Sequence, residues 1–244
     1  MSSLSPEESS HGRAGARSRA PREVAPTFTV SARRFGLVSA VGCVLLTSVY
    51  ASTLVAGLRS LPTPQQPIRD PYFSILEILI ILLAPLMVAL IGAVHAWAPM
   101  DAKASTLLAV VFAGLLAVVT CSVHTVILLV GRHATSSEVA GMPLFFSFAW
   151  PSVPYALDIL AWDVFFALAV LCAAPAFKGG GLAGLIRALL VTSGMLALAG
   201  LSGVAAGDMR LRGIGIVGYV GVFPVAVGLM ALLFRRATPR ASGP

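Results

Sequence analysis

Residues 72–96 read YFSILEILIILLAPLMVALIGAVHA, a stretch in which Glu77 is the only acidic residue and His95 the only basic one. An α-helix rises 1.5 Å per residue, so a helix of this length exceeds the roughly 30 Å hydrocarbon core of a bilayer. The apolar residues are continuous and do not alternate with polar ones, which favours a helix over a membrane β-strand. The stretch therefore predicts a transmembrane helix.

Five further continuous apolar runs have a similar length, and they lie at residues 35–57, 104–130, 153–177, 182–206 and 213–234. The whole chain of 244 residues is 57% apolar and 11% charged, with a mean hydropathy of +0.91. An ordinary soluble domain has roughly 25% charged residues. These values exclude a water-soluble globule and predict an all-α membrane protein, a bundle of six transmembrane helices.

The two ends of the chain are basic. Residues 1–34 are rich in Ser, Arg, Ala and Pro and lack apolar periodicity, which predicts a disordered basic tail. Residues 235–244 form a second, short basic tail. With the N-terminus inside, the inner segments hold 12 Lys and Arg residues and the outer loops 5, so we expect both termini to be cytoplasmic, in a plasma or inner membrane. Arg210 and Arg212, counted as outer-loop residues, oppose this orientation.

Several classes of function have little support in the sequence. No basic patch interleaved with aromatic residues suggests nucleic-acid binding, although the formal net charge is +7. Cys43, Cys121 and Cys172 are far apart and each lies inside an apolar run, which is typical of packing residues. No sequence motif predicts a cofactor, a metal or catalysis. Small residues in the last two spans favour close helix packing, including association of chains into an oligomer.

Five ionisable residues fall inside the predicted spans: Glu77, His95, His124, Asp158 and Asp163. Each costs roughly 2.5–3.5 kcal/mol in hydrocarbon on insertion scales and is therefore a candidate functional residue. Because successive helices alternate in direction, Glu77, His124 and Asp158 are expected at one level near the same membrane face. Asp163 is expected deeper, and His95 at the opposite end of its helix.

Helical angles refine this arrangement. His124 continues a stripe of small residues on its helix, which permits close helix contact, so we expect it to face the bundle interior. Asp158 and Asp163 differ by about 140° on an unbroken α-helix and would not reach one point. The resulting hypothesis is a polar pocket of Glu77, His124 and Asp158 with Asp163 below it. Hydrogen bonding between helices, without further function, is the simpler alternative.

Two segments bear on access to this pocket. It is expected to open toward Arg132 and His133, in the connection at residues 131–152. The second half of that connection, Met142–Trp150, is apolar and aromatic, as in an interfacial lid or a re-entrant gate. Residues 150–163 read WPSVPYALDILAWD. With the six-span layout, this segment resembles uncharacterised bacterial polytopic membrane proteins, a resemblance that implies a membrane family without an assigned activity or catalytic residues.

Three functions fit these observations. The leading hypothesis is transport of a small solute or of protons along Glu77, His124, Asp158 and Asp163. The second is an intramembrane lipid hydrolase, with His124, Glu77 and Asp158 as ligands of a metal. The third is a non-catalytic scaffold or partner subunit that associates through its small-residue faces. The expected partners are the lipid bilayer and, for the first hypothesis, a small solute or proton.

Overall fold

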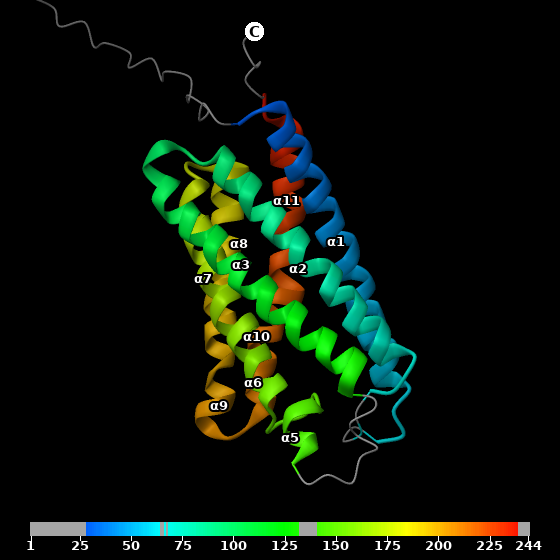
Figure 1. Cartoon of the computed structure of the whole chain (residues 1–244). Coiled ribbons are helices and arrows are strands. Elements are labelled where there is room, and N and C mark those ends of the chain that lie inside the picture. Colours follow the sequence, from blue (N-terminus) through cyan, green and yellow to red (C-terminus); the bar gives the residue numbers. More distant parts are fainter. Residues whose placement is uncertain (1–27, 64–65, 67, 132–140, 239–244) are drawn as a thin grey trace, which may run out of the picture.

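The computed structural model describes residues 28–63, 66, 68–131 and 141–238. Within these ranges the chain is helical and contains no strand (Figure 1). Six helices in the described part are long and apolar enough to cross a membrane. The predicted all-α bundle of six transmembrane helices is thereby confirmed, and the chain is a multi-pass membrane protein.

The first three spans are nearly regular helices. They are α1 (Val30–Arg59), α2 (Tyr72–Trp97), and a third span in which the 3₁₀ turn η1 (Met100–Ala102) leads into α3 (Lys103–Val126) and the π-helical turn η2 (Ile127–Gly131). The short helix α5 (Met142–Phe146) lies in the connection to the fourth span.

The last three spans are interrupted by π and 3₁₀ turns. The fourth consists of α6 (Val153–Ile159), the π-helical η3 (Leu160–Phe165), α7 (Phe166–Ala173) and η4 (Ala174–Ala176). The fifth consists of α8 (Gly181–Gly200) and α9 (Ser202–Ala206). The sixth consists of η5 (Met209–Arg212), α10 (Gly213–Ile216), the π-helical η6 (Val217–Val222) and α11 (Phe223–Arg236).

Polar caps set several of these boundaries. The Ala32 amide donates to Thr29 Oγ1 at 3.2 Å, so α1 begins at Val30, inside the stretch predicted to be a disordered tail. The sixth span begins at Met209, four residues earlier than predicted, because Asp208 Oδ1 accepts from the Arg210 amide at 3.0 Å. This earlier start brings Arg212 into the span. Residues 1–27 and 239–244 of the two predicted tails lie outside the described residues.

The first and last spans pack together at the end that carries both termini (Figure 1). Arg33 donates from Nε to the Phe234 carbonyl at 3.0 Å and from Nη2 to the Arg235 carbonyl at 2.8 Å. A Cβ at Gly36 would lie 2.9 Å from the Phe234 ring, so a glycine is needed for this approach of α1 to α11. The other side of α1 carries exposed apolar residues such as Val38, which is 69% exposed, and this side suits lipid.

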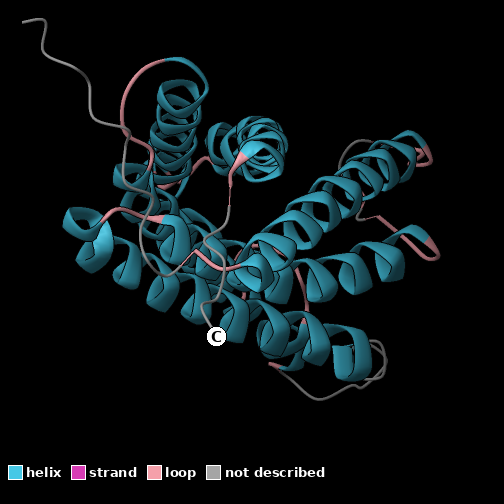
Figure 2. Cartoon of the chain, turned by 90° about the horizontal axis from the view of Figure 1, so that it is seen from above, coloured by secondary structure: helices cyan, strands magenta, loops and turns pink. Residues whose placement is uncertain are grey.

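Toward the opposite end the spans diverge. Figures 1 and 2 show α1 and α2 extending away from the fourth, fifth and sixth spans there. The fourth span packs against the third and fifth spans and is the most buried of the six, because 56% of its most apolar window lies inside the protein. This arrangement places the ionisable side chains of the fourth span, Asp158 and Asp163, in the interior.

Candidate functional site

Five ionisable side chains from four spans form one connected series, here called the ion network: Glu77, His124, Asp158, Arg212 and Asp163. Glu77 Oε2 lies 2.7 Å from His124 Nδ1, and His124 Nε2 lies 3.4 Å from Asp158 Oδ1. Arg212 donates from Nη2 to Asp158 Oδ2 at 2.7 Å and from Nε to Asp163 Oδ2 at 3.0 Å. All five residues are buried.

The structure thus brings together Glu77, His124 and Asp158, which the sequence places at one level of the membrane. His95 lies outside the network, where its Nδ1 is 2.8 Å from Thr106 Oγ1. Arg132 and His133, toward which the pocket was expected to open, lie outside the described residues.

Asp158 and Asp163 bind the same guanidinium group, which the angle calculated for an unbroken α-helix does not allow. The difference arises from η3, because a π-helix bonds each amide to a carbonyl five residues earlier. Each turn then holds roughly one additional residue, and residues five apart return to nearly the same face. The fourth span therefore does provide a pair of carboxylates, and the assumption of a regular helix was wrong.

Arg212 is the member of the network that sequence reasoning missed. Counted as part of an outer loop, it instead lies in the first turn of the sixth span and is 5% exposed. Its guanidinium carbon lies 4.7 Å from the centre of the Tyr155 ring, a cation–π distance. The signal available in the sequence was Asp208, a capping residue four positions earlier, which marks where the span begins.

Two glycines make room for Asp163, which is fully buried. An added Cβ would lie 2.6 Å from Asp163 Oδ1 at Gly215 and 3.0 Å from the same atom at Gly200. Asp163 Oδ1 has no hydrogen-bond partner within the described part of the chain. Close contact between α8 and α10 therefore encloses this carboxyl group on the side away from Arg212.

We expect Gly215→Ala to destabilise the protein by about 1–3 kcal/mol, the usual range for overpacking, because its methyl group must displace the Asp163 carboxyl group. Gly213→Ala is the matched control, since a Cβ at Gly213 would meet no atom within 4 Å. Unfolding of both variants in detergent micelles measures the difference. Equal stabilities would show that Asp163 is not enclosed at this helix contact.

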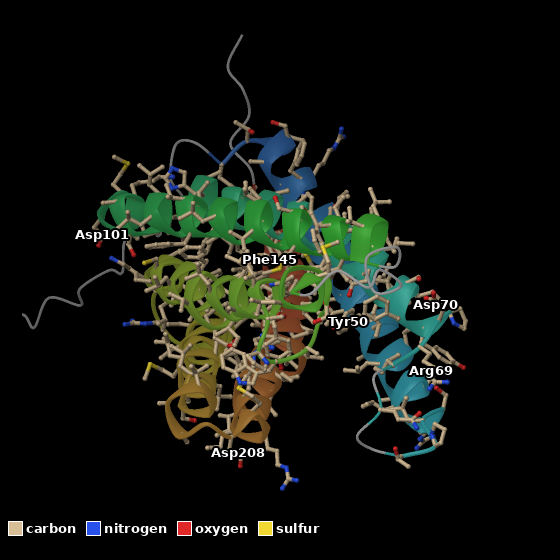
Figure 3. All side chains as sticks on the ribbon, turned by 60° about the horizontal axis from the view of Figure 1, so that its bottom comes forward. Tyr50, Arg69, Asp70, Asp101, Phe145 and Asp208 are labelled. Atoms are coloured by element: carbon tan, nitrogen blue, oxygen red, sulfur yellow. The ribbon has the colours of Figure 1, made fainter. Side chains whose placement is uncertain are left out.

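A cavity of about 310 Å³ adjoins the network and is lined by Glu77, His124, Asp158 and Arg212. Six aromatic residues contribute to its otherwise mainly apolar wall: Tyr50, Phe73, Phe148, Tyr155, Trp162 and Tyr219. Tyr50 extends from α1 toward the centre of the molecule (Figure 3). The lining includes Ile68 and Phe148, which belong to connections at the end away from the termini, so the cavity extends to that end.

Phe148 covers the network on this side. Its ring centre lies 5.4 Å from that of His124 and 5.4 Å from that of Tyr155. Trp150 continues the cluster, with its ring centre 6.1 Å from Tyr155. Phe148 is therefore the residue of Met142–Trp150 that lines the cavity, and the interfacial lid and the re-entrant gate both stay predictions.

His124 lies between two carboxyl groups, and the positions of the protons decide whether it can bond to both. An ionised carboxylate only accepts hydrogen bonds, and a neutral imidazole has a single N–H. His124 therefore bonds Glu77 and Asp158 together only when it carries both ring protons, or when one of the carboxyl groups carries a proton. These forms hold the same number of protons and differ only in which of the three side chains carries the second one.

Other candidate groups have packing roles. Ser193 Oγ donates to the Gly218 carbonyl at 2.9 Å, between the fifth and sixth spans. Cys43, Cys121 and Cys172 are free thiols. Among the described residues, no group of three or more His, Cys, Asp and Glu side chains is arranged to hold a metal ion.

Comparison of the chain with family models, curated proteins and solved structures finds no significant match.

Proposed function

We propose that this protein transports a small solute across the membrane, coupled to the movement of protons through the ion network. The observation that carries this proposal is the contact between a cavity of about 310 Å³ and four of the five buried ionisable side chains of the ion network. Replacing a buried ion pair by apolar residues is often neutral or stabilising. Stability alone therefore gives no reason to keep such a network, whereas a proton or solute pathway does.

The proposed proton path runs from Glu77 through His124 to Asp158 and on to Asp163, which shares the Arg212 guanidinium group with Asp158. Histidine is suited to this role because its charge changes near physiological pH. The contact between His124 and Asp158, at 3.4 Å, is longer than an ordinary N–H···O bond, whereas Asp158 and Arg212 are 2.7 Å apart. Arg212 therefore holds Asp158 firmly, and the longer contact to His124 is the step that solute binding is expected to tighten or break.

The proposed orientation places both termini in the cytoplasm of a plasma or inner membrane. The start of the first helix and the end of the last helix lie together at one end of the molecule (Figure 1). Because Arg212 is buried in ion pairs, it no longer counts as a loop charge on the outer side. The excess of Lys and Arg on the side of the termini is then larger than the sequence count suggested. In this orientation the cavity extends toward the outer face.

The test is proton flux in proteoliposomes that contain the purified protein and a trapped pH indicator. Glu77→Ala and Asp163→Ala are expected to abolish flux driven by a pH gradient, while both proteins still insert. Asp101→Ala is the control, because Asp101 is an exposed acid paired with Lys178 outside the network. Unchanged flux in the Glu77 and Asp163 variants would contradict the proposal and leave the hydrolase and scaffold hypotheses.

A further inference from the structure

We infer that the solute is a monovalent organic cation, an amine with a compact apolar body that enters the cavity and pairs with Glu77. The inference rests on the proposed transport function, for which it names the solute class. It depends on three features of the cavity: the charge balance of the ion network, an oxygen of Glu77 that none of the described residues engages, and the aromatic wall.

The charges of the network do not balance. Glu77, Asp158 and Asp163 are acidic, and Arg212 is the one permanently charged base among them. Even with His124 protonated, three ionised carboxyl groups leave one negative charge in excess. An uncompensated charge beside a mainly apolar cavity wall is costly, so the network favours an additional proton or another cation. A solute with a single positive charge provides that compensation.

Glu77 is the group that faces such a cation. It is 3% exposed and lines the cavity. Its Oε2 atom is engaged by His124, whereas Oε1 has no hydrogen-bond partner among the residues that the structure describes. Both oxygens of Asp158 are already engaged, by His124 and Arg212. The unengaged Glu77 oxygen is therefore the acceptor for an ammonium group in the cavity.

The aromatic wall suits the same ligand. Faces of aromatic rings attract cations, and clusters of such rings are used to bind alkylammonium ligands. The ring centres of Phe148 and Tyr155 are 5.4 Å apart, and those of Trp162 and Tyr219 are 5.3 Å apart. Two aromatic ring pairs therefore border the cavity. The guanidinium carbon of Arg212 lies 4.7 Å from the centre of the Tyr155 ring, so this wall already accommodates one cation.

Size and charge exclude other solute classes. The volume of about 310 Å³ is at the lower end of the range for ligand pockets, so the solute is small. An anion would require an available base, but Arg212 is committed to Asp158 and Asp163. A neutral solute would fill the apolar part of the cavity without compensating the excess negative charge.

The experiment compares three probes of similar shape and different charge: phenethylamine, 2-phenylethanol and 3-phenylpropanoate. Calorimetric titration of the wild-type protein in detergent, with a detergent-only blank, gives the three affinities. Phenethylamine is expected to bind about tenfold more tightly than 2-phenylethanol, as one buried charge contact provides, and 3-phenylpropanoate more weakly than either. Glu77→Gln is expected to remove the preference for the amine, whereas Asp101→Asn keeps it.

The comparison of probes on the wild-type protein decides the inference even if Glu77→Gln fails to fold. Equal affinities for the amine and the alcohol, preference for the anion, or no binding of any probe would overturn it. Selective binding of the amine without proton flux would support the cation site and contradict the proposed transport. Proton flux without selective binding of the amine would support transport and overturn the solute class.

Discussion

Arg212→Gln is expected to lower the free energy of unfolding by about 3–5 kcal/mol, the range observed when one partner of a buried ion pair is removed. Asp158 and Asp163 would then remain in the interior without their shared cation, since Arg212 is the guanidinium that contacts both at 2.7 and 3.0 Å. Chemical unfolding in detergent micelles measures the loss.

Arg210→Gln is the matched control for this substitution, because Arg210 lies two residues away on the same turn and is exposed. A surface charge of this kind contributes at most about 1 kcal/mol. Adding Asp163→Asn to Arg212→Gln is expected to restore part of the stability, because it removes one of the two carboxylates that have lost Arg212. Equal effects of the Arg210 and Arg212 substitutions would mean that Arg212 is not paired in the interior.

His124→Asn is expected to reduce proton flux in proteoliposomes by about 100-fold or more, the lower end of what positioned proton-transfer groups contribute to reactions. His124 bridges Glu77 and Asp158, and an asparagine in its place carries hydrogen bonds but takes up no proton at neutral pH. The rate of internal pH change after a pH jump measures the effect.

His95→Asn is the corresponding control, because His95 is the other histidine within the described spans and lies outside the network. It is expected to leave flux within about twofold of wild type, since no proton-transfer group is removed from the path. Similar flux in the wild-type protein and the His124 variant would exclude His124 from the proton path. An equal loss in both variants would indicate a general effect of altering the spans.

The six spans and the common level of three polar residues follow from simple rules. Continuous apolar runs predict helices of membrane length, and alternating helix direction brings Glu77, His124 and Asp158 to one level. Both rules depend only on counting residues along regular helices. They succeed for Glu77 and Asp158, because the helix is regular from the start of the span to each of these residues.

The same counting fails where the helix is not regular. The π-helical turn η3 lies between Asp158 and Asp163 and changes the face on which Asp163 appears. Nothing in the local sequence marks such a turn, because it depends on packing against neighbouring spans. Arg212 was missed for a related reason: a charged residue next to an apolar run is ordinarily a loop residue, and only its buried partners reveal that it belongs to the span.

The cavity wall required the three-dimensional arrangement as well. Tyr50 and Tyr219 come from the first and sixth spans, and no pattern along the chain relates either residue to Glu77. π-helical turns recur around this cavity: η2 begins three residues after His124, and η6 contains Tyr219. Such turns are frequent at functional sites, where they redirect side chains that a regular helix would place elsewhere.

Access of water to the ion network through the cavity is the most direct test of this account. After replacement of Cys43, Cys121 and Cys172 by Ala, two single-cysteine variants of α1 are compared: Thr47→Cys, which lines the cavity, and Ser39→Cys, which is equally a buried hydroxyl position but does not. A membrane-impermeant, positively charged methanethiosulfonate reagent is added to vesicles on the side away from the termini. We expect rapid labelling of the Thr47→Cys variant alone. Equal labelling of both variants, or no labelling of Thr47→Cys, would contradict it.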